Sequence, residues 1–323
     1  LCGCQGLVSN STTTTTTTIA PATTTTTGGN PNWSGKTITF GAIFSTSVIT
    51  TPYGTSQVRG ADLALAQINA TGGVNGAKLA LTVTDDGSDP ATAAANMAQL
   101  TQNGAIDAVL GPTFSNAATS ADPVANSAGV VVLAVSNTAP GIVGSCAYPC
   151  TWIFRDSLGE QTAIPVNIDT YASEKHPSTA VVIAPTGDAY GAATAQVAVA
   201  ALHAMHVTVN QPVVVPSSEP DLANAVSAAL AAKPSVLVVT SSSSSVAAGV
   251  IVDARKAHFT GGILGANAFN SPATAQAAGT YGKGAQSAAA WFPGDKSPTN
   301  EAFITAYKAK YASEPDQFAT QSY

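Results

Sequence analysis

Uncharged polar residues gather where the predicted strands of this chain end. These residues are nearly all Ser, Thr, Gly, Asn or Tyr, and they follow strands in both halves of the sequence, at 45–53, 111–116, 136–138, 185–190, 241–245 and 265–267. Parallel sheets bind ligands in the crevice beyond the carboxyl ends of their strands. Hydroxyl and amide groups hold a ligand by neutral hydrogen bonds but supply few general acids or bases. The residue types predict a binding crevice rather than a catalytic centre.

Ser115 and Asn116 stand at the predicted start of a helix over 115–127. The first turn of a helix offers free backbone N–H groups and a positive dipole end, so a ligand carboxylate could bind there. Alternatively, Ser115 only caps its own helix, as Ser commonly does. The two interpretations are compatible, and both stay open at this point.

Signatures of enzymes and metal sites are absent from the sequence. We find no G-x-S-x-G nucleophile elbow, no phosphate loop with G-K-[ST], and no G-x-G-x-x-G fingerprint. His203 and His206 are three residues apart, but no carboxylate lies within the same turn, which favours a surface position. Asp85-Asp86-Gly87 reads as a turn that leads to a helix cap at Asp89. We therefore expect no catalytic residue, no metal and no cofactor.

Strands and helices alternate from Lys36 onward. The predicted strands are 37–44, 79–84, 106–110, 130–135, 179–184, 207–215, 236–240 and 262–264. The predicted helices are 57–70, 90–100, 115–127, 164–171, 190–205, 223–232, 246–257 and 302–311. Repeated βα units form mostly parallel sheets with helices on both faces. Because the alternation is interrupted around residues 140–155, we expect an α/β protein with two doubly wound parallel-sheet lobes joined by a hinge.

The composition limits the partners that this chain can have. Hydrophobic residues make up 45% of the 323 residues, which is enough for a buried core, whereas charged residues make up only 9%. The formal net charge is −6 and no cluster of Lys or Arg occurs, which disfavours nucleic acid as a partner. No apolar run approaches the roughly 18 residues of a membrane helix.

The four cysteines fall into two pairs. Cys146 and Cys150 enclose Ala147-Tyr148-Pro149, a short loop that can close as a disulfide in an oxidising compartment. Free thiols are the alternative. A metal site would need further ligands, and none lies nearby in the sequence.

The N-terminal residues Leu1-Cys2-Gly3-Cys4 resemble the lipobox of bacterial lipoproteins. The resemblance implies a signal peptide removed before Cys4 and a lipid anchor on Cys4. Residues 1–35 continue with low-complexity threonine runs, which we predict to be a disordered tether between that anchor and the folded body. An ordinary disordered N-terminus is the alternative. The expected location is extracytoplasmic, at the bacterial cell membrane.

Several motifs are similar to those of type I periplasmic binding proteins, in the leucine/isoleucine/valine-binding branch that serves ABC transporters. They are Tyr53-Gly54, Arg59-Gly60-Ala61, the string I-N-A-T-G-G-V-N-G at 68–76, and D-D-G-S-D-P at 85–90. Further matches are Thr138-Ala139-Pro140, Tyr190-Gly191 and Ala254-Arg255, and the resemblance covers residues 36–323. It implies two lobes that close on a ligand, a transition for which this class of protein is a known example.

The resemblance also implies lobe boundaries and site residues. The N-terminal lobe would comprise 36–140 plus about 291–323, and the C-terminal lobe about 141–290. Ser115 matches the hydroxyl that binds a ligand carboxylate, Ser136 a backbone contact, and Thr138 a threonine that contacts carboxylate and amine. The aromatic residues expected to line or close the cleft are Tyr53, Tyr190 and Phe114.

Two positions depart from the family pattern. Asn267 stands where amino-acid-binding members have a glutamate for the ligand ammonium, and Ser243 stands near the position of a family tyrosine. Asp188 could replace the glutamate, although a solvent-facing loop carboxylate is the alternative. A buried ammonium without a carboxylate costs several kcal/mol, so the ligand is left open among amino acids, amides and small carboxylic acids.

The resemblance implies a monomeric substrate-binding protein that delivers its ligand to an ABC permease in the membrane. The alternative is a ligand sensor or receptor for amides or small carboxylic acids that uses the same fold.

Overall fold

The structure, a computed structural model, describes residues 32–48, 52–144, 146–210, 213–215 and 222–323. Residues Trp33–Tyr323 form one structural unit. Cys4, the lipobox resemblance and the threonine runs lie outside the described residues. Within those residues, no helix combines the length and the apolar character needed to cross a membrane.

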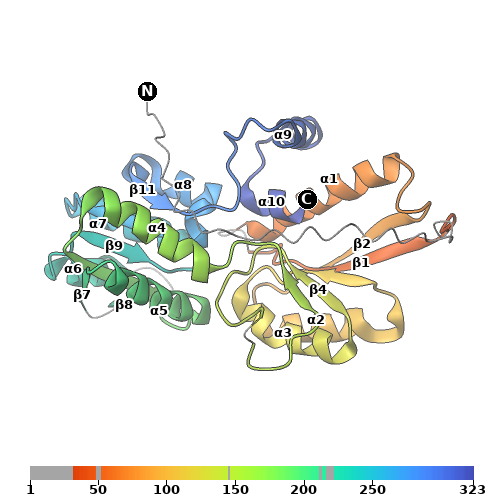
Figure 1. Cartoon of the computed structure of the whole chain (residues 1–323), viewed down its shortest axis with the longest axis horizontal. Helices are drawn as coiled ribbons and strands as arrows, with labels where there is room; N and C mark the ends of the chain where they lie inside the picture. The colour runs from red at the N-terminus through yellow and green to blue at the C-terminus, as the bar shows by residue number, and fades with distance from the viewer. Residues whose placement is uncertain (1–31, 49–51, 145, 211–212, 216–221) are drawn as a thin grey trace, which may run out of the picture. The chain divides into compact units, whose positions relative to one another are not determined.

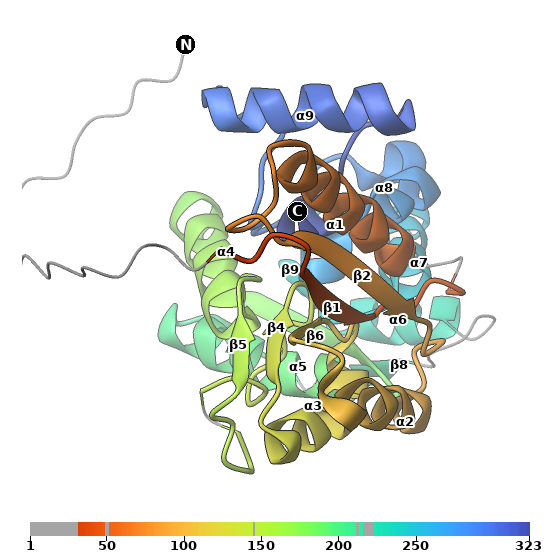
Figure 2. The same cartoon turned by 90° about the vertical axis from the view of Figure 1, so that its right-hand side faces the viewer.

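The first lobe is built on a five-stranded sheet in the order β2-β1-β3-β4-β5, with every neighbouring pair parallel. Its strands are β1 (Thr37–Ile43), β2 (Lys78–Thr84), β3 (Ala108–Leu110), β4 (Val131–Ala134) and β5 (Ile153–Arg155). Its helices are α1 (Tyr53–Ala70), α2 (Pro90–Thr101), η1 (Gln102–Gly104) and α3 (Ser115–Ala128). Helices α2 and α3 cover one face of this sheet and α1 covers the other (Figure 2).

The second lobe is built on a six-stranded parallel sheet in the order β11-β10-β9-β6-β7, with β8 also paired to β6. Its strands are β6 (Thr179–Pro185), β7 (Thr208–Val209), β8 (Val213–Val215), β9 (Val236–Val239), β10 (Gly262–Gly265) and β11 (Ala285–Ser287). Its helices are α4 (Glu160–Lys175), α5 (Ala189–Ala204), α6 (Leu222–Ala231), α7 (Ser244–Lys256), η2 (Asn267–Asn270), α8 (Pro272–Ala278) and η3 (Gly279–Gly282).

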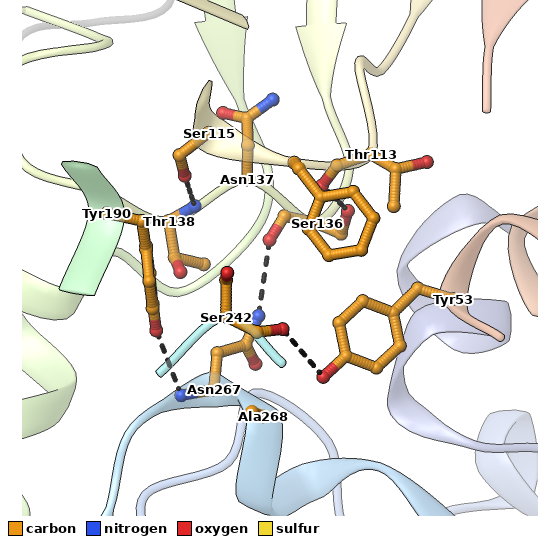
Figure 3. Close-up of a pocket in the computed structure, with 11 residues that line it drawn as sticks. Tyr53, Thr113, Ser115, Ser136, Asn137, Thr138, Tyr190, Ser242, Asn267 and Ala268 are labelled. Atoms are coloured by element: carbon orange, nitrogen blue, oxygen red, sulfur yellow. Dashed lines mark hydrogen bonds between the residues drawn. The ribbon is translucent and has the colours of Figure 1, made fainter. Parts of the chain in front are cut away.

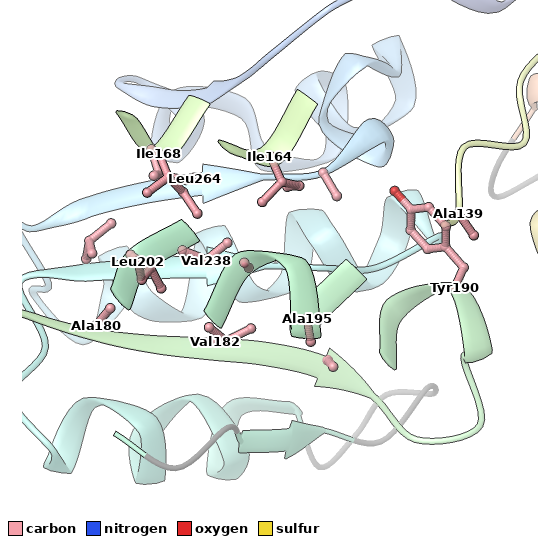
Figure 4. Close-up of a cluster of buried hydrophobic side chains, with 14 of the residues drawn as sticks. Ala139, Ile164, Ile168, Ala180, Val182, Tyr190, Ala195, Leu202, Val238 and Leu264 are labelled. Atoms are coloured by element: carbon pink, nitrogen blue, oxygen red, sulfur yellow. The ribbon is translucent and has the colours of Figure 1, made fainter. Parts of the chain in front are cut away.

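Two apolar clusters fix the second lobe, one on each face of its sheet. On one face, Ile164 and Ile168 of α4 and Leu202 of α5 pack on Val182 and Val238 (Figure 4). On the other face, α6 and α7 pack on the same strands. Both lobes are therefore doubly wound parallel sheets, and the predicted fold class is confirmed.

The last two helices, α9 (Pro298–Tyr311) and α10 (Gln317–Ser322), return to the first lobe (Figure 1). Phe303 and Tyr307 of α9 and Ala319 of α10 pack on Leu63 of α1. Gly60 makes this contact possible, because a Cβ there would lie 1.9 Å from the carbonyl oxygen of Ala319. The glycine of the Arg59-Gly60-Ala61 motif thus serves the packing of two helices.

The predicted boundary at residue 140 needs correction. β5 pairs in parallel with β4 and so extends the first sheet. Tyr148 and Cys150, in the loop before β5, pack against the core of the first lobe. The segment 141–155 was assigned to the second lobe because a three-residue strand between a cysteine loop and a helix leaves no apolar period to recognise.

Candidate ligand-binding site

A small pocket lies between the two lobes, beside the carboxyl ends of their strands (Figure 3). Its lining residues come from both lobes and are Tyr53, Thr113, Phe114, Ser115, Ser136, Asn137, Thr138, Tyr190, Ser242, Asn267 and Ala268. The structure brings together seven of the eight residues that the sequence singled out for ligand contact; Ser243 is not among the lining residues. The lining includes no histidine and no cysteine.

Helix α3 presents an uncapped N-terminus to this pocket. Its N-cap residue is Phe114, whose side chain makes no capping hydrogen bond, so Ser115 occupies the first helical position rather than the cap. The Ser115 hydroxyl accepts hydrogen bonds from the backbone nitrogens of Thr138 (3.2 Å) and Ala139 (3.1 Å). Those two bonds orient the hydroxyl and leave its proton available to an acceptor. An anion at this place would also meet the free N–H groups of the first helical turn.

A buried amide holds the adjoining wall of the first lobe. Gln57 is fully buried, donates to the Ser136 hydroxyl (2.7 Å) and accepts from the Thr113 hydroxyl (2.6 Å). Ser136 in turn donates to the carbonyl oxygen of Thr113 (2.6 Å). Each polar group in this row of hydrogen bonds has a partner within the protein, so the wall is rigid before any ligand enters.

Three aromatic rings close the pocket on the side of α1. Tyr53 stacks on Phe318 of α10 with ring centroids 3.9 Å apart, and its ring lies 5.5 Å from that of Phe114. Its hydroxyl reaches the second lobe, 3.1 Å from the Ser244 hydroxyl. Burial raises the pKa of Tyr53 well above its ordinary value, so the phenol stays a neutral hydrogen-bonding group.

Two polar residues of the second lobe stabilise helices instead of facing the pocket. Ser243 caps α7, accepting from the backbone nitrogen of Val246 (3.4 Å), and its neighbour Ser242 lines the pocket in its place. Asp188 caps α5 through the nitrogen of Gly191 (3.1 Å) and accepts from the nitrogen (2.8 Å) and hydroxyl (2.9 Å) of Ser242. Asp188 is buried, not solvent-facing, and both its oxygens are already bonded within the protein.

Asn267 joins the lobes directly. Its side-chain nitrogen donates to the carbonyl oxygen of Ser136 across the pocket (3.2 Å), and its side-chain oxygen accepts from Gln317 (2.7 Å). The backbone nitrogen of Tyr190 donates to Asn116 of the first lobe (3.1 Å), which adds a second contact between the lobes. These bonds hold the lobes together in the arrangement that the structure describes.

Glu160, which sequence reasoning did not single out, holds three of the residues that line the pocket. It is 1% exposed at the first position of α4, and its Oε1 accepts from the Tyr190 hydroxyl, the Thr138 hydroxyl (3.2 Å) and the backbone nitrogen of Asn267 (3.0 Å). All three donors line the pocket. Glu160 follows the end of β5, and the rule that site residues follow strands would have found it had β5 been predicted.

Burial dominates the electrostatics around Glu160. Desolvation raises the pKa of Glu160, although its hydrogen bonds and the charge of Arg155 act in the opposite direction. Burial also raises the pKa of Asp122, another carboxyl under the influence of the Arg155 charge, to about 8. Among the described residues, the Oε2 atom of Glu160 and both carboxylate oxygens of Asp122 have no hydrogen-bond partner.

Comparison with known proteins places this geometry in a family. A family model described as periplasmic binding protein matches residues 37–323. Over 90 residues, 28% of this chain, the sequence is 39% identical to the leucine-, isoleucine-, valine-, threonine- and alanine-binding protein of Pseudomonas aeruginosa. The matched stretch covers 24% of that relative, about a quarter of its length.

Solved structures extend the likeness to both lobes. The branched-chain amino acid transporter substrate binding protein of Streptococcus pneumoniae, solved with isoleucine, has a TM-score of 0.76 and 26% identity, covering 89% of this chain and 81% of that one. A solute binding protein of an ABC transporter from R. palustris, solved with benzoate, has a TM-score of 0.77 at 20% identity, covering 88% of this chain and 77% of that one; this second likeness shows the fold alone. The motifs, the two doubly wound lobes and the family match agree, and the chain belongs to the periplasmic binding protein family.

Proposed function

We propose that this chain is the extracytoplasmic solute-binding protein of an ABC importer of the branched-chain amino-acid type, and that it catalyses no reaction. Its two lobes close on a small polar ligand and present the closed form to a permease in the membrane. A ligand that touches both lobes stabilises the closed form over the open one, because only the closed form offers all of the contacts. The pocket lined from both lobes supports this proposal.

The observation that carries the proposal is the uncapped N-terminus of α3 beside the oriented hydroxyl of Ser115. Helix ends without a side-chain cap need a partner for their N–H groups. A ligand carboxylate would supply that partner and accept the proton of Ser115. In this proposal Thr138 and the backbone of Ser136 complete the contact from the first lobe, and Tyr53, Phe114, Tyr190, Ser242 and Asn267 enclose the ligand.

The remaining parts of the proposal concern location and assembly. The first lobe comprises residues 36–155 plus about 291–323, and the second lobe the segment between them. A lipid on Cys4 anchors the protein to the cell membrane. The threonine runs that follow act as a tether between this anchor and the two folded lobes. In this proposal Cys146 and Cys150 form a disulfide, which their positions in the structure support and which fits the oxidising conditions of that location. The protein acts as a monomer.

Binding measurements on the purified chain test the proposal. L-Leucine, L-isoleucine, benzoate and acetamide are titrated by calorimetry, and small-angle X-ray scattering follows the shape of the protein during titration. We expect at least one carboxylate-bearing compound to bind and to reduce the radius of gyration as the lobes close. Heat without any change in scattering, or no binding by any carboxylate, would contradict the proposal.

A second candidate is a ligand sensor or receptor for amides or small carboxylic acids. It is favoured by Asn267, an amide where amino-acid-binding relatives have a carboxylate, and by the R. palustris neighbour solved with benzoate. Tight binding of acetamide or benzoate together with no binding of either amino acid would select it. Loss of uptake in a deletion strain would instead select the importer.

A further inference from the structure

We propose that the far end of the second lobe is a cationic face that binds a surface of anionic lipid headgroups. By the far end we mean the starts of the strands of the second sheet, together with the helix ends and loops that lead into them. The pocket lies at the other ends of these strands, which run toward Tyr190 (Figure 4). The proposal goes beyond the proposed function, because this second surface takes no part in holding the ligand.

A basic side chain stands shortly before each strand along the path of the second sheet. In sheet order these are Lys283 before β11, Lys256 before β10, Lys233 before β9, Lys175 before β6 and His206 before β7. The strands are parallel and β9, β10 and β6 start nearly level in register. Because neighbouring strands lie about 4.8 Å apart, the five positions form a row across the far end. We call its four lysines the far-end lysines.

The far-end lysines have little negative charge beside them. All four are exposed, and together with Arg255 they are five of the 12 Lys and Arg residues of the chain. In the last helical turns and the loops that lead into these strands, the acidic residues are Glu174 and Asp253, out of 18 in the chain. Salt bridges between described residues use only Lys296 and Lys308 as cations. The far end is therefore net positive in a chain whose net charge is −6.

The helix dipole is an alternative explanation for part of this row. Lys175 and Lys256 lie in the last turns of α4 and α7, where a cation complements the partial negative charge of the helix end. Lys233 lies beyond the end of α6, however, and Lys283 follows only the short 3₁₀ helix η3. The helices α1, α2 and α3 of the first lobe end without a basic residue in the last turn. The dipole therefore does not account for the whole row.

Several donor side chains at the far end occupy backbone positions where glycine is usual. His176, His206, His258 and Lys233 follow helix ends with left-handed φ values between 48° and 61°. Helices commonly place a glycine at such a position, because glycine adopts positive φ without a steric penalty. This chain places an exposed side chain with N–H donors at each of the four positions instead. Such donors suit the oxygen atoms of a phosphate group.

An exposed aromatic ring favours a lipid surface among the anionic partners. Tyr281 of η3 is 41% exposed and precedes Lys283 by two residues. Tyrosine is enriched at membrane–water interfaces, where the ring reaches apolar material and the hydroxyl stays in water. Because the row follows the edge of a sheet, it can meet a flat surface along its whole length. A row of lysines with a tyrosine at one end therefore fits headgroups better than a folded protein partner.

A surface bound at the far end does not cover the pocket, since the two lie at opposite ends of the same strands. In the proposed function, this contact would add a second attachment to the lipid on Cys4. The tether would hold the far end at a high effective concentration near the membrane, so that even weak binding would be sufficient.

Sedimentation with lipid vesicles tests the proposal on the full chain carrying Cys4→Ser, so that no acyl chain contributes. The vesicles are phosphatidylcholine alone or a mixture with about one-third phosphatidylglycerol. We expect binding to the mixed vesicles only, and its loss in about 1 M NaCl, where the Debye length is about 3 Å. Changing Lys175→Gln, Lys233→Gln, Lys256→Gln and Lys283→Gln together should weaken binding by about tenfold or more.

The matched control changes four exposed lysines outside the second lobe, Lys36→Gln, Lys78→Gln, Lys296→Gln and Lys308→Gln, and alters the net charge equally. Its binding should stay within about twofold of the parent chain. An equal loss in both variants, or no binding of the parent chain to the mixed vesicles, overturns the proposal. Binding of soluble heparin without binding of vesicles also overturns it, and identifies an anionic polymer as the partner.

Circular dichroism checks the fold of each variant. Should the fourfold variant fail to fold, the pairs Lys175→Gln with Lys233→Gln and Lys256→Gln with Lys283→Gln decide, and each should weaken binding by about threefold. Unchanged binding in both pairs overturns the proposal. No ligand is present in these experiments, so their failure leaves the proposed function intact.

Discussion

The helix ends at the two sides of the pocket differ in how their N–H groups are satisfied. In the first lobe, α3 begins at Ser115 without a side-chain cap. In the second lobe, α5 and α7 begin beside the same pocket but are capped by Asp188 and Ser243. A capped end has its donors occupied by the protein, whereas an uncapped end keeps them for a ligand.

In the proposed function this difference would give the two lobes different roles in holding a ligand. The first lobe offers hydrogen-bond donors, namely the α3 end and the Ser115 hydroxyl, and so is suited to the anionic end of a guest. In the second lobe the ends of α5 and α7 are closed by side chains, whereas α4 begins at Glu160 without a side-chain cap. The Glu160 carboxylate and the Asn267 amide of this lobe lie near the pocket. Similar folds on the two sides thus produce a pocket whose two walls offer different hydrogen-bonding groups.

The largest expected effect concerns the anionic end. Ser115→Ala and Thr138→Ala should each weaken binding of the carboxylate ligand by ~1–3 kcal/mol, because a buried polar group loses its partner. Calorimetry measures the loss. Thr119→Ala, an exposed hydroxyl on the same helix that donates to the carbonyl oxygen of Asn116, is the matched control. Unchanged affinity in both variants would remove the α3 end from the site.

The disulfide loop tests whether affinity depends on these local bonds or on the stability of the first lobe. Replacing Cys146 and Cys150 by serine should lower the free energy of unfolding by about 2 kcal/mol, the chain-entropy value for so short a loop. The loop packs on the first-lobe core and contributes no residue to the pocket. Urea unfolding should therefore show the loss while the dissociation constant stays within about twofold. A parallel loss of affinity would mean that the anion site depends on the whole lobe.

The smallest effect is expected at a capped end. Ser243→Ala removes the cap of α7 and should lower the free energy of unfolding by about 1 kcal/mol, with ligand affinity changed by less than about twofold. Ser245→Ala is the control, because its exposed hydroxyl bonds Ser243 without capping the helix. A large loss of affinity in Ser243→Ala would show that this residue contacts the ligand and that the contrast between the lobes is wrong.

The sequence was sufficient for the fold and for most of the lining, because both depend on local patterns. Alternating βα periods predicted the doubly wound lobes, and the positions just after strand ends predicted Ser115, Thr138 and Tyr190. The cap at Asp89 was also recognisable, and its side chain accepts from the nitrogen of Thr92 (2.7 Å).

The roles of Glu160, Ser242 and Asp188 depend on contacts between distant segments, and the sequence did not reveal them. β5 is three residues long and is recognisable only by its pairing with β4, so Glu160 behind it was missed. Within the run of serines at 241–245, the residue types are identical, and only the start of α7 decides that Ser243 is a cap and Ser242 a lining residue. Asp188 looked like a loop carboxylate because its partner Ser242 is 54 residues away.

The side-chain amide of Asn267 donates a hydrogen bond to the carbonyl oxygen of Ser136. It therefore competes with any ligand that would bind the same oxygen. A ligand that binds this carbonyl oxygen must first displace the Asn267 carboxamide. Its measured dissociation constant therefore exceeds the intrinsic one by the inverse of the fraction of molecules in which the carbonyl is accessible. When the guest leaves, the amide returns to the same acceptor and no buried carbonyl is stranded. In the proposed function this bond would make release of the ligand easier and its capture weaker.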